Sequence, residues 1–443
     1  MNKIRKIELF FIISNLFVSI LFVLLFVNNS DFSRIGINSL TRMALVLLVV
    51  HLIQFKLLQV RYYDFRFWFI LLSYLFLLGR VFLLFIEPSY NFFWIQFSSY
   101  SGEIIKKTIS FTIVSIQVFF TSFLFYRKNP IKFNFLNQFN NMKSITFLTG
   151  VILISLSFPF RIYTDLTNVI SVQTTGSFES VGTGGSISNI LSTFFVPGII
   201  FLLVGLNKKR KLFVFSTILY FVMIMLLTGD RRYQTTSILS IILCYIVVND
   251  QKVKIKHFLI GILAVYFGLT LLTAIRIVRT EHLSGITVFL NYFINAEFGL
   301  AVLYEILSEF GLSYYSLIGV FQHIPNTFNY LNGLSFYGSI PSLFPSSGLV
   351  LGDFFSYVSI SNTINRLPGG HPVGATIIGD FYANFGNYSF IFMFIFGLIL
   401  SKIFVLHQNC SKYRLYSVAI YYSSFYILIN LVRSSFFEIF RPF

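Results

Sequence analysis

The residues best placed to do chemistry lie in one polar stretch, Pro368–Gly386, which directly precedes a long apolar run. A proline and two glycines break regular structure at its start. His371 then stands where it could cap a helix whose first residue is Pro372, and Gly386 stands where it could end that helix. The sequence therefore predicts a short helix over this stretch.

Three polar side chains share one face of this predicted helix, because Thr376, Asp380 and Asn384 are spaced four residues apart. Asp380 is a carboxylate among apolar neighbours, which suits it to general-base work; the alternative is that it pairs with an arginine. His371 is the second candidate base, with capping as its alternative role. On one straight helix His371 and Asp380 would lie about 14 Å apart, so at most one would touch the reacting atoms.

Arginines form two pairs at the ends of apolar segments. Arg231 and Arg232 precede one segment, and Arg276 and Arg279, three residues apart and so on one helix face, follow another. The planar guanidinium fork suits phosphate, and the start of a helix favours anions. We therefore predict a diphosphate site at these four residues, the alternative being arginines that only reach the membrane surface. Further candidates for the site are Arg161, Arg366, Arg433 and Asn384.

The composition is that of a membrane protein. Of 443 residues, 56% are hydrophobic and 11% are charged, with a mean hydropathy of +0.78. Soluble domains carry about 25% charged residues. The formal net charge of +17 comes mostly from short loops between apolar runs, which is the positive-inside pattern and excludes nucleic acid as a partner.

We predict an all-α bundle of about eleven membrane-spanning helices, within a range of roughly ten to fourteen. The basic start of the chain, Met1–Lys6, places the N-terminus in the cytoplasm, and the candidate arginines then fall on the outer side. Residues 276–387 contain no clean span and are predicted to form a large outer loop with short helices. The whole chain, 1–443, is predicted to be a single integral membrane domain. The expected spans are about 9–27, 43–60, 67–85, 108–126, 145–161 (ending at Arg161), 189–206, 212–228, 235–248, 258–275, 388–405 and 415–432, with Arg433–Phe443 emerging as an outer tail.

Several motifs of known chemistry are missing from the sequence. It holds no Asp-x-Asp pair, no phosphate-binding loop with Gly-Lys-Ser/Thr, and no His, Cys and carboxylate cluster at metal-ligand spacing. We therefore expect neither a metal nor a cofactor.

The chain resembles the Wzy-type O-antigen or oligosaccharide repeat-unit polymerases of bacteria. The sharpest likeness is Gly379-Asp-Phe-Tyr-Ala-Asn-Phe-Gly386, where the family often has Glu in place of Asp380. Thr228–Arg232 is similar to the family's arginine-bearing loop, and the layout of spans is similar over nearly the whole chain. His371 is similar in place to a histidine of the related O-antigen ligases.

This resemblance implies a glycosyltransferase that joins undecaprenyl-diphosphate-linked oligosaccharide units at the outer face of the bacterial plasma (inner) membrane. The arginines would hold the diphosphate, and no metal or nucleotide would be needed. The partners implied are the lipid-linked oligosaccharide, the lipid bilayer, and a chain-length regulator and a flippase of the same pathway.

Two alternatives remain open from the residues. One is an O-antigen ligase, which uses the same donor with a lipid A core acceptor. The other is a non-enzymatic flippase of lipid-linked oligosaccharides, which should carry charges through the membrane depth. In this chain the polar residues gather at the outer ends of the expected spans, and Lys56 and Arg80 are the main charges within them. This distribution favours an enzyme over a flippase.

Overall fold

The computed structural model describes residues 2–28, 35–88, 100–125, 140–175, 187–206, 209–228, 232–249, 268, 300–342, 344, 347–365, 374–409 and 414–440. Within these ranges the regular elements are all helices. The chain divides into two compact units. Unit 1 comprises Met1–Ile131, Leu307–Asn409 and Leu431–Arg441, and unit 2 comprises Lys132–Ile306, Cys410–Asn430 and Pro442–Phe443.

Unit 1 is built on five long helices, with α4 at their centre. In an apolar stretch of 18 residues within α4, 94% of the residues are buried inside the protein, against 17% in the corresponding stretch of α1. Helices α4 and α18 run in the same direction, because Phe111 meets Phe390 near their starts and the Ser401 hydroxyl donates to the Phe123 carbonyl further along. The five helices are α1 (Asn2–Val27), α2 (Ile37–Leu57), α3 (Phe65–Ile86), α4 (Gly102–Phe125) and α18 (Ser389–Asn409).

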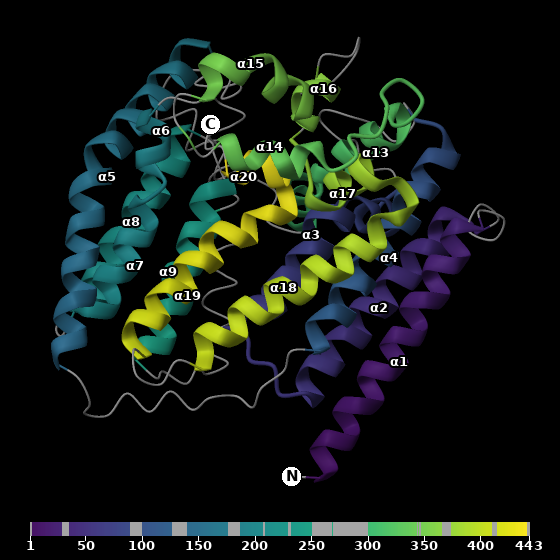
Figure 1. Ribbon diagram of the computed structural model, residues 1–443, viewed down its shortest axis with the longest axis horizontal. Helices are drawn as coiled ribbons and strands as arrows, with labels where there is room; N and C mark the ends of the chain where they lie inside the picture. Colours follow the sequence, from purple (N-terminus) through teal and green to yellow (C-terminus); the bar gives the residue numbers. More distant parts are fainter. Residues whose placement is uncertain are drawn as a thin grey trace. The chain divides into compact units, whose positions relative to one another are not determined.

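Short helices gather at one end of α4 and α18, as Figure 1 shows. Each is too short to cross a bilayer by itself, since a span needs about 20 residues. They are α13 (Ser313–His323), α14 (Leu334–Ser342), α15 (Ser347–Val358), α16 (Ile360–Asn365), α17 (Ile377–Phe385), the 3-10 turn η3 (Gly386–Tyr388) and α20 (Phe436–Phe440). Two further elements contain the residues at which the chain passes from one unit to the other. They are α12 (Leu300–Phe310) and η4 (Asn430–Arg433).

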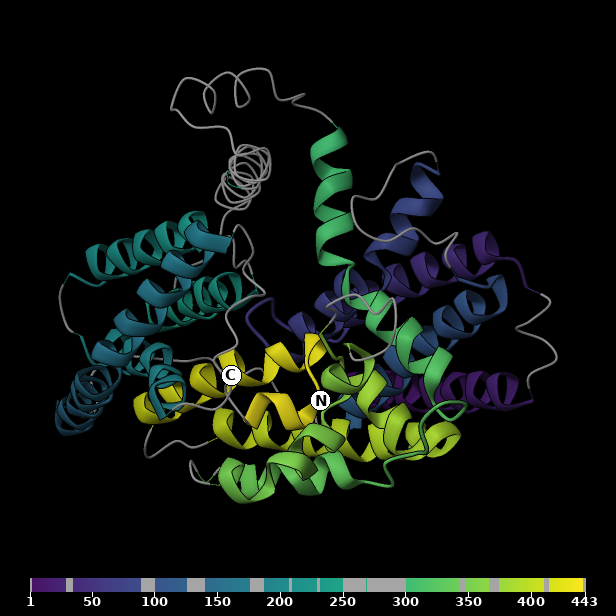
Figure 2. The ribbon, with the colours of Figure 1, turned by 90° about the horizontal axis from the view of Figure 1, so that it is seen from above.

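Unit 2 packs six helices, the first five of which are drawn in blue to teal in Figure 2, and α8 contacts both α5 and α9. Glycines bring α5 and α7 into close contact: a Cβ on Gly150 would lie 2.5 Å from the Leu202 nitrogen, and one on Gly205 would lie 2.6 Å from the Phe147 Cα. Small residues at such crossings are typical of membrane helices. The helices are α5 (Asn140–Thr175), α6 (Ile187–Ser192), α7 (Phe195–Gly205), α8 (Arg210–Thr228), α9 (Arg232–Val248) and α19 (Arg414–Ile429).

The predicted all-α fold with many spans is confirmed. Within the described residues, nine helices are long and apolar enough to cross a membrane, and they match nine of the expected spans. The expected span 235–248 corresponds to the shorter apolar helix Tyr233–Val248, while 258–275 lies outside the described residues. The nine are Ile7–Val27, Ile37–Leu57, Phe65–Ile86, Gly102–Phe125, Lys143–Val172, Ser188–Gly205, Arg210–Thr228, Ile377–Val405 and Leu415–Arg433.

The expected end of the fifth span at Arg161 is not the end of its helix. Helix α5 continues through Pro159 and Arg161 to Thr175, and its 36 residues make it about 54 Å long. The hydrocarbon core of a bilayer is only about 30 Å thick, so part of α5 extends beyond it. The helix continues because Ile162, Leu166 and Ile170 keep an apolar face at four-residue spacing after the arginine.

The start of the predicted helix before the tenth span is wrong. Helix α17 begins at Ile377, five residues later than Pro372, and Thr376 rather than His371 is its N-cap. The Thr376 hydroxyl accepts a hydrogen bond from the Gly379 N–H at 3.1 Å, which satisfies one of the free donors at the helix start. The predicted stop is confirmed, because Gly386 is the C-cap with a φ of +53°.

Part of the expected outer tail, Arg433–Phe443, is helical, and its outer position stays a prediction. Residues Phe436–Phe440 form α20, which packs on α14 within unit 1. The predicted single domain and the outer position of 276–387 stay predictions; the described part of 276–387 does fold into short helices.

The contact between α3 and the turn after α12 gives a test of unit 1. A Cβ on Gly311 would lie 2.3 Å from the Arg80 backbone nitrogen and 2.7 Å from the Leu307 carbonyl oxygen. Because backbone atoms cannot rotate away, we expect Gly311→Ala to destabilise the protein by about 1–3 kcal/mol and to lower Tm in detergent. Gly352→Ala is the matched control, since nothing lies within 4 Å of its Cβ position. An unchanged Tm for Gly311→Ala would contradict this packing.

Candidate functional site

Asp380 is fully buried, and three different elements donate hydrogen bonds to its carboxylate. Oδ1 accepts from the Ser335 hydroxyl of α14 at 2.6 Å and from the Asn384 amide of α17 itself at 2.9 Å. Oδ2 accepts from the Phe436 N–H at the start of α20 at 2.8 Å. An isolated buried carboxylate is costly, and these donors offset that cost. Asp380 is therefore bonded to a hydroxyl, an amide and a backbone N–H, in the place of the arginine that was its alternative partner.

Asn384 joins the end of α17 to the segment before α14. Its Oδ1 accepts from the Gly333 N–H at 2.9 Å, and its backbone carbonyl accepts from the Asn332 N–H at 3.1 Å. The Leu331 N–H bonds to the Ala383 carbonyl at 2.9 Å in the same way. Carbonyls at a helix end lack partners within the helix, and this segment supplies them. The predicted polar face of Thr376, Asp380 and Asn384 thus exists, and it is buried.

The α20 helix starts with a reciprocal cap that places the Phe436 N–H. The Ser435 hydroxyl accepts from the Glu438 N–H at 3.1 Å, and Glu438 Oε2 accepts from the Ser435 N–H at 3.3 Å. This pattern is a capping box. Glu438 is 4% exposed, and its Oε1 is buried without a hydrogen-bond partner in the described chain. The negative charge of Glu438 also acts on Asp380, so two acidic groups share this part of unit 1.

Arg433 lies three residues before Phe436, so the Cα atoms of the two residues are at most about 11 Å apart. Its Nε donates to the Ser313 hydroxyl of α13 at 3.0 Å, and its guanidinium stands 5.0 Å from the centre of the Phe76 ring on α3. Of the predicted site residues, unit 1 therefore brings Asp380, Asn384 and Arg433 into one region.

Arg80 lies on the same α3–α13 contact, one helical turn from Phe76 on α3. It is 1% exposed, its Nε donates to the Ser308 carbonyl at 2.8 Å, and its guanidinium stands 4.7 Å from the centre of the Tyr315 ring. Burial raises the pKa of the Tyr315 phenol, although Arg80 partly opposes this, so the hydroxyl stays protonated at neutral pH. Two guanidinium groups thus lie on one contact between α3 and α13.

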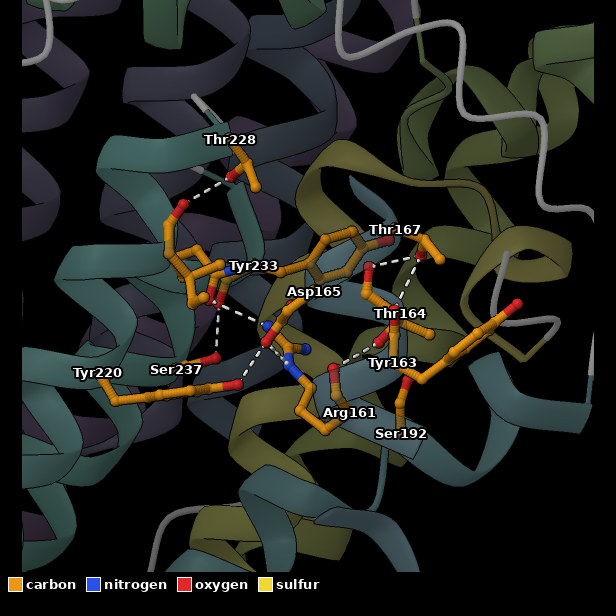
Figure 3. A network of polar contacts seen from close by, with 12 residues as sticks. Arg161, Tyr163, Thr164, Asp165, Thr167, Ser192, Tyr220, Thr228, Tyr233 and Ser237 are labelled. Atoms are coloured by element: carbon orange, nitrogen blue, oxygen red, sulfur yellow. Dashed lines mark hydrogen bonds and ion pairs between the residues drawn. The ribbon is translucent and has the colours of Figure 1, made fainter. Parts of the chain in front are cut away.

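Arg161 belongs to a separate polar network in unit 2, shown in Figure 3. Its Nε pairs with Asp165 Oδ2 at 2.8 Å, one turn further along α5, and Tyr220 of α8 donates a hydrogen bond to the same oxygen. Its Nη2 donates to Gln234 Oε1 at 3.3 Å. Because Gln234 lies two residues after Arg232, this network places Arg161 at the first turn of α9.

The other predicted site residues are only partly covered. Arg232 is the first residue of α9, but nothing is described of its side chain. The remaining five lie outside the described residues, so their roles and the predicted convergence of the arginine pairs stay predictions: Arg231, Arg276, Arg279, Arg366 and His371.

Three residues of the unit 1 site were not predicted from the sequence. Ser335 and Glu438 were not candidates, and Arg80 was noted only as a charge within a span. The Ser-x-x-Glu spacing of Ser435 and Glu438 is a readable capping signal for α20. Ser335 gives no such signal, because it meets Asp380 across 45 residues of chain.

The bond from Ser335 to Asp380 can be tested by its effect on stability. Ser335→Ala removes a donor from a buried carboxylate, so we expect a loss of about 1–3 kcal/mol and a lower Tm in detergent. Ser339→Ala is the matched control on the same helix, because its buried hydroxyl donates only to the Phe336 carbonyl of α14. Equal Tm values for the two variants would show that the Ser335 bond contributes nothing.

Comparison with protein families gives one match, to the O-antigen polysaccharide polymerase Wzy model, over residues 9–443. Comparisons with curated proteins and with solved structures give no match. The family match covers nearly the whole chain, including both units and every residue of the Asp380 network. The protein is therefore a multi-pass membrane protein that belongs to the O-antigen polysaccharide polymerase Wzy family.

Proposed function

We propose that the protein is a glycosyltransferase that polymerises undecaprenyl-diphosphate-linked oligosaccharide repeat units at the outer face of the bacterial plasma membrane. An acceptor sugar hydroxyl forms a bond to the anomeric carbon of the growing chain. The bond from that carbon to the carrier diphosphate breaks, and the diphosphate leaves with the electron pair. The hydroxyl proton passes to a base, so no metal or nucleotide is needed to balance the step.

The observation that carries the proposal is the carboxylate of Asp380 in the same unit as Arg433. A transfer from a diphosphate needs a group that takes a proton and cations that stabilise the leaving charge. The Phe436 N–H ties Asp380 to the short segment that also carries Arg433. Together with the family match over residues 9–443, this pair of charges supports polymerisation.

The burial of Asp380 limits how it can act. Both carboxylate oxygens are occupied by donors from the protein, so an acceptor hydroxyl reaches Asp380 only if one of these donors gives way. If none does, Asp380 is a positioning residue and His371, five residues before the Thr376 cap, is the base. Both assignments stay within the proposal.

Arg231, Arg232, Arg276 and Arg279 are proposed to hold the diphosphate of the donor, with Arg433, Arg161 and Arg366 as further candidates. The guanidinium fork binds two phosphate oxygens at once, which a lysine ammonium cannot do. The N-terminus of α9, which begins at Arg232, adds a favourable dipole for an anion.

The family match favours polymerase over the two alternatives. A ligase would transfer the chain to a lipid A core, and a flippase would move the lipid-linked unit without changing its length. A chain-length regulator and the flippase of the same pathway are proposed as functional partners.

The role of Asp380 can be tested in cells that lack the chromosomal gene. Asp380→Asn should reduce polymer by about 100-fold or more if Asp380 is the base, since general-base catalysis contributes about 10²–10⁴ in rate. If Asp380 only positions other groups, Asp380→Glu should keep most activity and His371→Ala should be the more damaging change. Surface polysaccharide on a gel, with membrane abundance measured in parallel, reports the outcome.

Two controls separate chemistry from folding in this test. Asp353→Asn removes an exposed carboxylate of α15 and should leave the polymer unchanged. Ser335→Ala weakens the same network but keeps the carboxylate, so it should lose stability more than activity. Full polymer from both Asp380→Asn and His371→Ala at normal abundance would remove this helix from the reaction.

The arginine pairs give a separate test. Lysine at Arg231, Arg232, Arg276 or Arg279 keeps the charge but loses the fork, so we expect lower polymerisation with normal membrane abundance. Arg42→Lys is the control, because Arg42 is exposed and lies outside the candidate set. Unchanged polymer in all four variants would count against diphosphate binding by these residues.

A further inference from the structure

Lys107 places its ammonium group beside two adjacent aromatic rings, Phe321 and Tyr382, whose centres lie 4.1 Å apart. Its Nζ lies 5.4 Å from the centre of the Phe321 ring of α13 and 5.9 Å from that of Tyr382 of α17. Lys107 itself is half-buried near the start of α4. These are cation–π contacts, so the ammonium is held at the rings rather than extended into water as in simple snorkelling.

Lys107 has no anionic partner in the described part of the chain. Neither of the ion pairs that join Arg66 to Asp64 and Arg161 to Asp165 involves Lys107. Glu103, one turn earlier on α4, is exposed and does not pair with Lys107. A half-buried ammonium without a carboxylate gains most from an anion brought by a ligand.

Two further side chains, Tyr330 and His323, come from the segment that follows Phe321. The Tyr330 ring lies edge-on to Tyr382 with its centre 6.1 Å away, and Tyr330 is partly exposed. A Cβ on Gly386 would lie 2.9 Å from the Tyr330 ring, so the glycine lets the backbone approach it closely. His323 ends α13, and burial lowers its pKa, so its ring is neutral at pH 7 and Lys107 carries the positive charge.

The proposed reaction has two diphosphate-bearing substrates with different needs. The donor diphosphate takes up charge as it leaves, which calls for arginine forks. The acceptor diphosphate stays attached to its sugar and has only to be positioned. A single lysine beside aromatic rings, which also offer apolar faces to a sugar, meets that need.

We propose that Lys107, Phe321, Tyr330 and Tyr382, the Lys107 cluster, form a subsite that binds the diphosphate of the acceptor lipid-linked repeat unit. The inference rests on the proposed function. Tyr382 and Asp380 belong to the same nine-residue helix, so an acceptor held at the cluster lies beside the helix that carries the candidate base. The predicted topology also places the start of α4 on the outer side, with α17.

The test measures polymerisation by purified full-length protein in nanodiscs of neutral phosphatidylcholine. The lipid-linked polymer donor is held at a fixed concentration while the undecaprenyl-diphosphate-linked repeat unit is varied. Lys107→Gln should raise KM for the repeat unit about tenfold, the loss of one charged contact, with kcat within about twofold. Lys107→Arg should restore KM to within about threefold, because it keeps the cation.

Matched variants guard against a trivial loss of folding. Lys402→Gln removes an exposed lysine from α18 and should leave KM unchanged. Tyr330→Phe keeps the ring and removes a partly exposed hydroxyl, so it should raise KM by about threefold without lowering Tm. If Lys107→Gln does not fold, the Tyr330→Phe measurement still decides the proposal, because an unchanged KM in that variant would overturn it.

The remaining outcomes are distinct. Active wild-type protein with an unchanged KM in Lys107→Gln overturns the subsite and leaves the proposed function intact. Wild-type protein that never extends the repeat unit overturns the proposed function itself. A KM effect that appears only in nanodiscs of anionic phosphatidylglycerol would show that Lys107 binds a bulk lipid headgroup, which also overturns the subsite.

Discussion

The architecture of unit 1 depends on the solvation of one buried carboxylate. Water cannot stabilise Asp380 at its position, so the protein must supply donors, and it draws them from α14, α17 and α20. These helices are far apart in sequence, and they also meet through the Phe336 ring of α14, which packs on Phe381 of α17 and Phe436 of α20. The Ser335 hydroxyl and the Phe436 N–H would lose their acceptor if the carboxylate were lost, so the three helices are stabilised together.

This constraint explains how the two sides of α17 are used. One side carries the carboxylate toward α14 and α20, whose start lies next to Arg433. The other presents Tyr382 to Phe111 of α4 and Phe321 of α13, at 5.3 Å and 4.1 Å between ring centres. The nine residues of α17 are therefore held by hydrogen bonds to α14 and α20 and by aromatic packing, of Phe381 on α14 and of Tyr382 on α4 and α13. Such a fixed element suits a site that must align two large substrates.

The sequence predicts the parts of this arrangement that depend on local pattern. Apolar run lengths locate the spans, four-residue spacing gives the polar face of α17, and Gly386 marks its end. The start of α17 was predicted wrongly because His371 and Thr376 are both residues that could cap a helix in this sequence. In the structure Thr376 is the N-cap, and its hydroxyl accepts from the Gly379 N–H. The bond from Ser335 to Asp380 and the pairing of Arg161 between helices depend on tertiary packing, which no local pattern records.

The most direct test of the central claim is a reaction that contains only the purified protein and the undecaprenyl-diphosphate-linked repeat unit. The account predicts a ladder of products in whole multiples of the unit, all still attached to the carrier, with one undecaprenyl diphosphate released per bond formed. The released carrier and the product lengths can be counted in the same sample by mass spectrometry. Products that appear only when a lipid A core is added, or a substrate that never grows beyond one unit, would contradict it.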